Sequence, residues 1–116
     1  MTILLLEDQA LIAIDLIDAL EAEGHGVAAF ASVREAGLWL RDHQPTAAIV
    51  DCVLSDGDCS PLVRQLRQGG VPIIIYTGGN TSDLGEDFST LDVFSKPTPT
   101  PDLLNAVYEK IASRQS

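Results

Sequence analysis

The chain has 116 residues, with seven Lys and Arg against seventeen Asp and Glu, so its formal net charge is −10. This length suits one domain that can bury enough apolar surface to fold without a disulfide or a metal. The acidic balance argues against nucleic acid and anionic membrane surfaces as partners, because proteins that bind them need clustered Lys and Arg. We expect no membrane span, since no apolar run reaches about 18 residues.

The start of the chain and its two cysteines indicate a reducing compartment. Met1-Thr2-Ile3 leads straight into an apolar segment, without the basic start of a signal peptide. Cys52 and Cys59 match no metal-binding or redox spacing, which favours two reduced thiols. We therefore expect a cytoplasmic protein.

Short apolar runs alternate with segments that have the composition of helices. The runs are continuously apolar, which is typical of strands covered on both faces in a parallel sheet. We therefore expect a three-layer, doubly wound α/β domain with right-handed crossovers. In chain order the sequence predicts strand Ile3–Leu6, helix 9–23, strand Val27–Phe30, helix 33–43, strand Ala47–Val50, helix 61–68, strand Ile73–Tyr76, strand Val93–Phe94 and helix 101–113.

Capping residues support the predicted helix ends. Ser32-Val33-Arg34-Glu35 matches a capping box, in which hydroxyl and carboxylate satisfy backbone N–H groups reciprocally. Ser60-Pro61 and Thr100-Pro101 each place a capping hydroxyl before a proline suited to the first helical position. Gly24 predicts the end of the first helix. Residues 78–90 are rich in turn formers, so the fourth helix of such a fold is expected to be short or weak.

Polar side chains follow four of the five predicted strands. Glu7-Asp8 follows the first strand, Asp51 the third, Thr77 the fourth and Lys96 the fifth. The second strand ends in Ala31-Ser32, without a charge, as an outer strand would. Because the carboxyl ends of parallel strands share one edge of the sheet, we expect these polar groups to converge there.

Three carboxylates at one edge repel one another, by about 3 kcal/mol per pair at about 5 Å and an effective dielectric near 20. Raised pKa values or a bound cation would relieve this repulsion, and a set of oxygen ligands suits Mg²⁺. With the Lys96 ammonium and the Thr77 hydroxyl, the set suits phosphoryl transfer, with Asp51 as the nucleophile. Each residue alone is more often a turn residue, helix cap or surface charge, whereas the ordered set is far more specific.

Four segments together resemble the motifs of bacterial response-regulator receiver domains of two-component systems. They are Leu5-Leu6-Glu7-Asp8, Ile49-Val50-Asp51, Tyr76-Thr77-Gly78 and Phe94-Ser95-Lys96-Pro97. The resemblance covers almost the whole chain. It implies a CheY-like, flavodoxin-like fold with strand order 2-1-3-4-5, and a cis peptide bond between Lys96 and Pro97.

The resemblance also implies roles for individual residues. Asp51 would be the phosphoacceptor, which takes its phosphoryl group from a sensor histidine kinase or a histidine phosphotransfer protein. The chain would then assist its own phosphorylation and dephosphorylation without being an enzyme that acts on another substrate. Mg²⁺ would be held directly by Asp8, Asp51 and the Val53 carbonyl, and by Glu7 through water, while Thr77 and Lys96 would bind phosphate oxygens.

Three features depart from the common family pattern, and one is the short stretch between Thr77 and Lys96 with its weak fourth helix. The aromatic residue that often lies three positions before the lysine is Val93 here, and the neighbouring Phe94 should point to the opposite face of the sheet. The segment Pro72–Asn80 resembles, imperfectly, variant receivers with a Phe-Ala-Thr-Gly fourth-strand motif, which are often single-domain proteins. We therefore expect one receiver domain over residues 1–116, with no output domain.

The first predicted helix offers a docking surface for the partner. Helical spacing places Ile12, Ala13, Leu16 and Leu20 in the core and leaves Leu11 exposed beside Asp15. Since kinase helices pack on the first helix of receivers, we expect Leu11 and Asp15 to contact the partner. An isolated exposed leucine is also common without any function.

Other functions remain open at this point. An aspartyl phosphatase of the haloacid-dehalogenase type needs a second Asp two residues after the nucleophile, where this chain has Val53. A degenerate receiver that serves only as a protein-binding module is the alternative to the phosphorylation switch. Homodimer formation is open as well.

Overall fold

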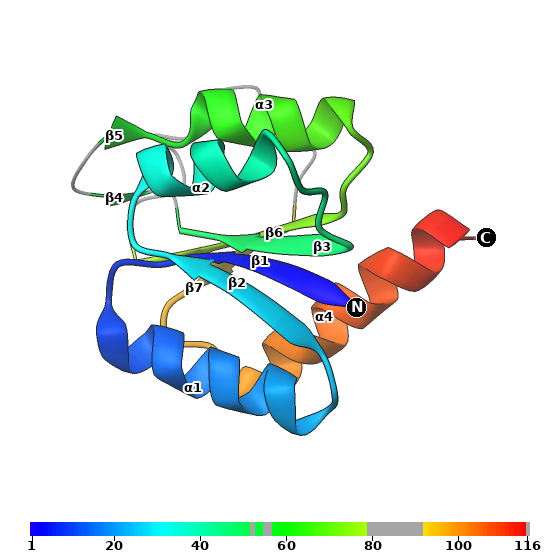
Figure 1. Ribbon diagram of the computed structural model, residues 1–116. Helices are drawn as coiled ribbons and strands as arrows, with labels where there is room; N and C mark the ends of the chain where they lie inside the picture. Colours follow the sequence, from blue (N-terminus) through cyan, green and yellow to red (C-terminus); the bar gives the residue numbers. More distant parts are fainter. Residues whose placement is uncertain (52, 55–56, 79–91, 116) are drawn as a thin grey trace.

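The computed structural model describes residues 1–51, 53–54, 57–78 and 92–115, and its centre is a five-stranded parallel sheet (Figure 1). The strand order is β2-β1-β3-β6-β7, which is the predicted order 2-1-3-4-5 counted along the sheet strands. β2 is an edge strand, as its uncharged end predicted. The strands are β1 (Thr2–Leu6), β2 (Gly26–Phe30), β3 (Ala47–Val50), β6 (Ile73–Thr77) and β7 (Asp92–Ser95).

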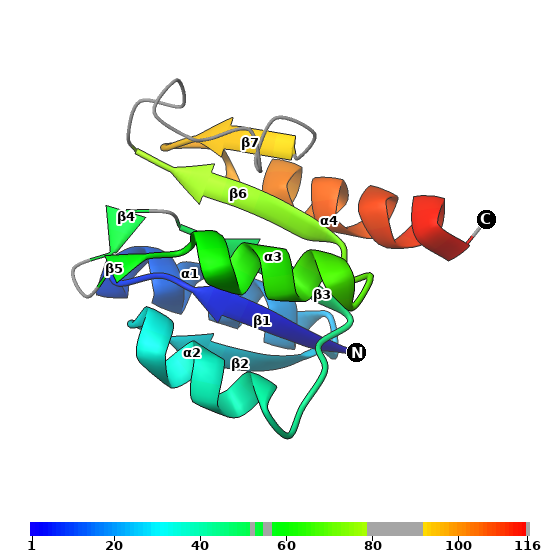
Figure 2. The same cartoon turned by 90° about the horizontal axis from the view of Figure 1, so that it is seen from above.

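Helices cover both faces of the sheet. Figures 1 and 2 show α2 and α3 on one face and α1 and α4 on the other. All four predicted helices are confirmed, and α2 ends three residues earlier than predicted. Their bounds are α1 (Ala10–Ala22), α2 (Val33–Leu40), α3 (Ser60–Gln68) and α4 (Thr100–Gln115). None of these four helices combines the length and the hydropathy that a membrane span requires.

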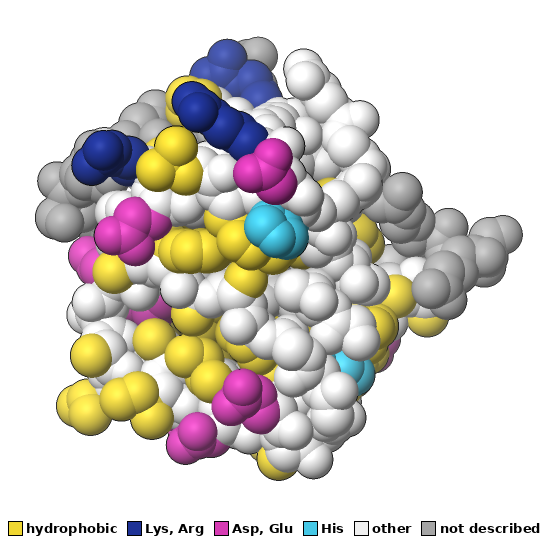
Figure 3. Space-filling view, in the orientation of Figure 1, with side chains coloured by type: hydrophobic (Ala, Val, Ile, Leu, Met, Phe, Trp, Pro, Cys, Tyr) yellow, Lys and Arg dark blue, Asp and Glu magenta, His cyan; other side chains and the backbone are white. Residues whose placement is uncertain are grey.

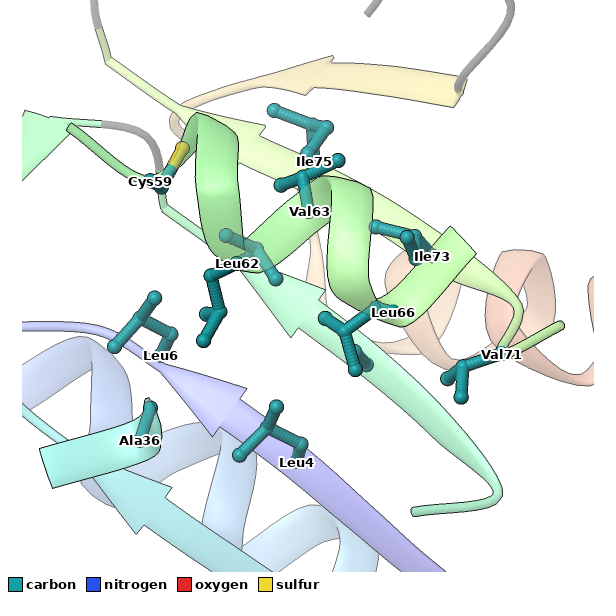
Figure 4. Close-up of a cluster of buried hydrophobic side chains, with 12 residues drawn as sticks. Leu4, Leu6, Ala36, Cys59, Leu62, Val63, Leu66, Val71, Ile73 and Ile75 are labelled. Atoms are coloured by element: carbon teal, nitrogen blue, oxygen red, sulfur yellow. The ribbon is translucent and has the colours of Figure 1, made fainter. Parts of the chain in front are cut away.

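The sheet divides the core into two apolar clusters, because successive strand side chains point to opposite faces. Leu4 and Leu6 pack under α2 and α3, in the cluster drawn in Figure 4. Ile3 and Leu5 pack against α1 and α4. Each of these four side chains is at most 1% exposed, so each contributes about 1.5–3 kcal/mol through burial. Both faces of β1 are thereby buried, which explains its continuous apolar sequence.

Helix ends follow the predicted residues in two cases. The Ser32 hydroxyl accepts a hydrogen bond from the Glu35 N–H at 3.1 Å, as its half of the capping box requires. Gly24 has a φ of +89°, and its N–H donates to the Glu21 carbonyl at 3.0 Å. Glycine is favoured there because other residues rarely adopt this left-handed conformation.

Two predicted caps are wrong. α3 begins at Ser60, one residue early, so Cys59 holds the cap position and its side chain does not cap the helix. α4 begins at Thr100, whose hydroxyl donates to Asp15 Oδ2 at 2.6 Å and so ties α4 to α1. Proline can occupy either of the first two helical positions, because its missing N–H has no acceptor within the helix there.

A second, two-stranded sheet lies beyond β3 and was not predicted. β4 (Val53–Leu54) pairs antiparallel with β5 (Gly57–Asp58). Cys59, which follows β5, is buried at the start of α3 in Figure 4. The expected loop at residues 78–90 lies outside the described residues except for Gly78, and Cys52 lies outside them as well.

Candidate functional site

The sheet brings the predicted polar residues to one edge. Glu7 and Asp8 follow β1, Asp51 follows β3, Thr77 ends β6, and Lys96 follows β7. These strands are neighbours in the order β1-β3-β6-β7, so their carboxyl ends lie next to one another. Backbone bonds hold the ends in register: the Asp51 N–H donates to Leu6 O at 2.8 Å, and the Lys96 N–H donates to Thr77 O at 2.9 Å.

Three carboxylates converge at this edge. One carboxylate oxygen each from Glu7, Asp8 and Asp51 lies within 4.8 Å of the others. Glu7 is 4% exposed and Asp51 is 3% exposed, whereas Asp8 is exposed to solvent. Two of the three negative charges are thus removed from water at short range, an arrangement that requires compensation by positive charge.

Lys96 supplies part of that compensation. Its Nζ lies 2.9 Å from Glu7 Oε1, 2.9 Å from Asp51 Oδ2 and 3.0 Å from Gln9 Oε1. The three N–H groups of an ammonium therefore meet three oxygen acceptors. The Gln9 N–H in turn donates to Glu7 Oε1 at 3.0 Å, which links the start of α1 to the same carboxylate.

The pKa values of this cluster reflect burial and charge. Burial raises the pKa of Glu7, and its hydrogen bond to Lys96 offsets this only in part. Burial by itself lowers the pKa of Lys96, but the hydrogen bonds to Glu7 and Asp51 outweigh it and leave that pKa raised. Lys96 is thus held as a cation, and its single positive charge faces three carboxylates.

The donor set fits a hard divalent cation. Three carboxylate oxygens within 4.8 Å of one another, two of them on buried residues, carry more negative charge than one lysine neutralises. Mg²⁺ prefers oxygen ligands of this kind and keeps several waters, which the exposed side at Asp8 allows. Val53 follows closely, at the start of β4.

Thr77 is 2% exposed at the end of β6, beside the β3 end that carries Asp51. The bond between Lys96 and Pro97 is cis, as predicted. Val93 packs with the α2 and α3 cluster and Phe94 with the α1 and α4 cluster, so Phe94 points away from the face where Val93 lies, as predicted.

A groove lies beside Lys96, between α1 and the start of α4. It has a volume of about 720 Å³. Leu11, 85% exposed on α1, lies at this groove together with Asp15. The carboxylate of Asp15 accepts the hydrogen bond from Thr100, so it already has a partner within the chain. The floor and walls are formed by Ile12, Leu16, Tyr76, Lys96, Pro97, Thr98, Pro99, Thr100 and Leu103.

Sequence reasoning missed two residues that contact Lys96 or its turn. Gln9 accepts a hydrogen bond from the ammonium, and only its position directly after the acidic pair could have indicated this. Tyr76 ends the predicted strand Ile73–Tyr76, and an apolar run carries no signal for a bond to a distant turn. Its hydroxyl bonds to the backbone of Thr98, as a buried tyrosine hydroxyl needs a partner.

Comparison with solved structures supports the fold. The chain has a TM-score of 0.88 and 24% identity to a CheY-like receiver domain protein from Methanospirillum hungatei, covering 98% of this chain and 95% of that one. A putative response regulator from Chloroflexus aurantiacus gives a TM-score of 0.82 and 27% identity, with coverage of 96% and 97%. The first likeness shows the architecture alone, and the second adds modest sequence similarity.

Curated relatives are longer than this chain. The virulence transcriptional regulatory protein PhoP of Salmonella typhimurium is 39% identical over 79 residues, which cover 66% of this chain and 35% of the relative. The transcriptional regulatory protein PhoP of Escherichia coli is 37% identical over the same length. The chain thus matches about a third of the length of these relatives.

A family model covers far more of the chain. The model of the response regulator receiver domain matches residues 3–108, which include all the polar residues at the edge of the sheet: Glu7, Asp8, Asp51, Thr77 and Lys96. Together with the strand order and the acidic cluster, this match settles the family. The chain belongs to the response regulator receiver domain family, whose members are phosphoacceptor switches of two-component signalling.

Proposed function

We propose that Asp51 accepts the phosphoryl group in this receiver. The observation that supports it is the environment of Asp51: a buried carboxylate 2.9 Å from the Lys96 ammonium, with the Glu7 and Asp8 oxygens within 4.8 Å. A carboxylate that is desolvated and already paired with a cation is suited to attack an electrophilic phosphorus.

The transfer itself displaces a histidine. An oxygen of Asp51 attacks the phosphorus of a phosphohistidine on the partner, the new P–O bond forms, and the P–N bond breaks. The electron pair of that bond stays on the histidine nitrogen, which then takes up a proton. Lys96 would exchange one of its oxygen partners for a phosphate oxygen, and Thr77, at the neighbouring strand end, would donate its hydroxyl to another.

Mg²⁺ would be held by Asp8 and Asp51 directly, by Glu7 through water, and by the Val53 carbonyl. When bound, it would neutralise charge that develops on the phosphoryl oxygens. The fit of three close carboxylate oxygens to a hard cation supports this ligand set. The same chain would assist its own phosphorylation and dephosphorylation, and it would not act on a separate substrate.

The partner would be a sensor histidine kinase or a histidine phosphotransfer protein, and we place it on α1. Exposed Leu11 and the groove beside Lys96 lie next to the edge where a phosphohistidine must approach Asp51. Figure 3 shows hydrophobic and acidic side chains side by side over α1, at the bottom of the view. A helix with apolar and basic side chains would match that surface. Such a partner would place the chain in the cytoplasm.

Phosphorylation by a small donor tests the proposal without the kinase. The protein is incubated with acetyl phosphate and Mg²⁺, and its intact mass is measured. We expect a labile gain of one phosphoryl group in the wild type and in Asp42→Asn, which alters an exposed carboxylate after α2. Asp51→Asn should show no gain. Equal labelling of Asp51→Asn and wild type would remove Asp51 from this role.

The binding-module alternative predicts something different. A degenerate receiver would bind its partner with the same affinity before and after incubation with acetyl phosphate, and it would gain no mass. The absence of an output domain and the formation of a homodimer stay predictions. The mass of the denatured chain from cell extract tests the first, and the mass of the native protein tests the second.

A further inference from the structure

Tyr76 occupies a distinctive position beside the site. It precedes Thr77 in β6 and points to the opposite face of the sheet, toward α1 and α4. Its side chain is 5% exposed and forms part of the wall of the groove next to Lys96. Tyr76 thus lies next to Thr77 in the chain and next to Lys96 at the groove, outside the cluster of three carboxylates.

The hydroxyl of Tyr76 clamps the turn that carries Lys96. It accepts a hydrogen bond from the Thr98 N–H at 3.0 Å and donates to the Thr98 carbonyl at 3.4 Å. On the other side of the turn, the Lys96 N–H donates to the Thr77 carbonyl at 2.9 Å. Two adjacent residues of β6 therefore hold both ends of the turn 96–98, which fixes the point from which the lysine side chain extends.

The ring of Tyr76 also lies next to the lysine head group. Lys96 Nζ is 5.6 Å from the ring centroid, within the range of a cation–π contact. The same ammonium bonds to Glu7, Asp51 and Gln9. The Tyr76 hydroxyl thus holds the backbone of the turn from which Lys96 extends, and the Tyr76 ring faces the Lys96 ammonium.

We propose that Tyr76 is a positioning residue for phosphoryl transfer, and that it acts through Lys96. The inference rests on the proposed role of Asp51. A lysine has a flexible four-carbon stem, and its ammonium must reach a phosphate oxygen while still neutralising buried carboxylates. Holding the turn in one geometry before the reaction removes that ordering cost from the transfer step.

A purely structural tyrosine would give a different pattern. Its loss would lower stability and leave the rate of transfer in the folded protein unchanged. The chain offers a matched control, because Tyr108, its other tyrosine, has a hydroxyl bonded to Glu23 and His25 where α1 ends and β2 begins. That place is at the amino ends of the strands, away from Lys96.

The test compares Tyr76→Phe with Tyr108→Phe, each of which loses a hydroxyl and keeps its ring. For Tyr76→Phe we expect phosphorylation by acetyl phosphate to be about five- to tenfold slower at saturating Mg²⁺. The dissociation constant for Mg²⁺ should be unchanged, since the carboxylates stay in place. Tyr108→Phe should keep the wild-type rate.

A second readout needs no phosphorylation. The chain has two lysines, Lys96 and Lys110, so selective ¹³C labelling of lysine side chains gives two sets of NMR signals. We expect the terminal signals of Lys96 to shift or broaden in Tyr76→Phe and to stay unchanged in Tyr108→Phe. Lys110, which pairs with Asp92 at 3.5 Å, serves as the internal reference.

Each contrary result has one meaning. A wild-type rate in Tyr76→Phe, or equal slowing in both tyrosine variants, would overturn the inference and leave the role of Asp51 standing. Weaker Mg²⁺ binding in Tyr76→Phe would show that the carboxylates moved, which would overturn the assignment to Lys96. A wild type that gains no phosphoryl group would instead refute the proposed function, and this inference with it.

Discussion

At Asp51 a buried carboxylate competes with Glu7 for one ammonium, with Asp8 close by. Replacing Asp51 by Asn removes one of three negative charges and keeps the shape of the side chain. We expect Asp51→Asn to be as stable as the wild type or more stable when no divalent cation is present, because like-charge repulsion falls. Urea unfolding of both proteins measures this. A loss of more than about 2 kcal/mol would mean that the bond to Lys96 outweighs the repulsion.

The stability of the fold should depend on pH through Tyr108. Burial, followed by the hydrogen bond to Glu23, raises the pKa of Tyr108 to about 12 from its ordinary value of 10.0. Because the folded state holds the proton more tightly than the unfolded state, Tyr108 stabilises the fold below pH 10, and this contribution is lost as the pH rises toward 12.

The prediction is that the wild type loses more stability than Tyr108→Phe between pH 10 and pH 12. Melting temperatures of the two proteins across this range give the comparison. All other ionisable groups are the same in both proteins, so their effects cancel in the difference. Parallel curves for the two proteins would show that the hydroxyl contributes nothing that depends on pH.

The convergence of the polar residues at the strand ends could be predicted from the sequence, because parallel strands place their carboxyl ends at one edge of the sheet. Glu7, Asp8, Asp51, Thr77 and Lys96 all follow that rule. The contacts of Lys96 with Gln9 and with the ring of Tyr76 were not readable. They depend on side-chain directions across strands and helices that are distant in the sequence, and neither residue type carries a local signal for them.

Among the elements, α1 carries the surface proposed for the partner. Leu11 is 85% exposed, so Leu11→Ala should change stability by less than about 0.5 kcal/mol. If Leu11 packs against the kinase, the variant should slow phosphotransfer from the kinase by about fivefold or more, with little change for acetyl phosphate. Leu38→Ala is the matched control, since Leu38 is 47% exposed on α2, across the sheet.

Asp15 requires a separate comparison, because its carboxylate accepts a hydrogen bond from Thr100. Asp15→Lys reverses a charge on the docking surface and also breaks that link between α1 and α4. Thr100→Val breaks the link and leaves the charge. We expect kinase transfer to fall in Asp15→Lys and to stay near the wild-type rate in Thr100→Val. Equal losses in both would assign Asp15 to helix packing, and losses with both donors would place the defect in the site.

Element prediction succeeded where the pattern is continuous and local. The four helices and five sheet strands follow from apolar runs and capping residues such as Ser32 and Gly24. The hairpin of β4 and β5 has two residues in each strand, too few for a period to be recognised. The start of α4 was misjudged because Thr100 bonds to Asp15, which lies on another helix.

For the whole molecule, the carboxylate cluster of Glu7, Asp8 and Asp51 predicts that Mg²⁺ stabilises the folded state. A ligand that binds only the folded state raises stability by mass action, here by about 1–3 kcal/mol at saturating concentration. This gain should disappear in Asp8→Ala. It should persist in Asp42→Ala, which removes an exposed carboxylate after α2, outside the cluster. Thermal melting with and without Mg²⁺ at constant ionic strength measures it, since a net charge of −10 also responds to salt. Equal shifts in all three proteins would indicate general screening and no site.

The location of the phosphoryl group tests the central claim most directly. Borohydride reduces an aspartyl phosphate to homoserine, so treatment after phosphorylation marks the residue that carried the group, and peptide mass mapping then finds it. We predict homoserine at position 51 in the wild type and none in Asp51→Asn. Homoserine at position 8 or at any other aspartate, or none in a protein that has gained the mass of a phosphoryl group, would contradict the assignment of Asp51.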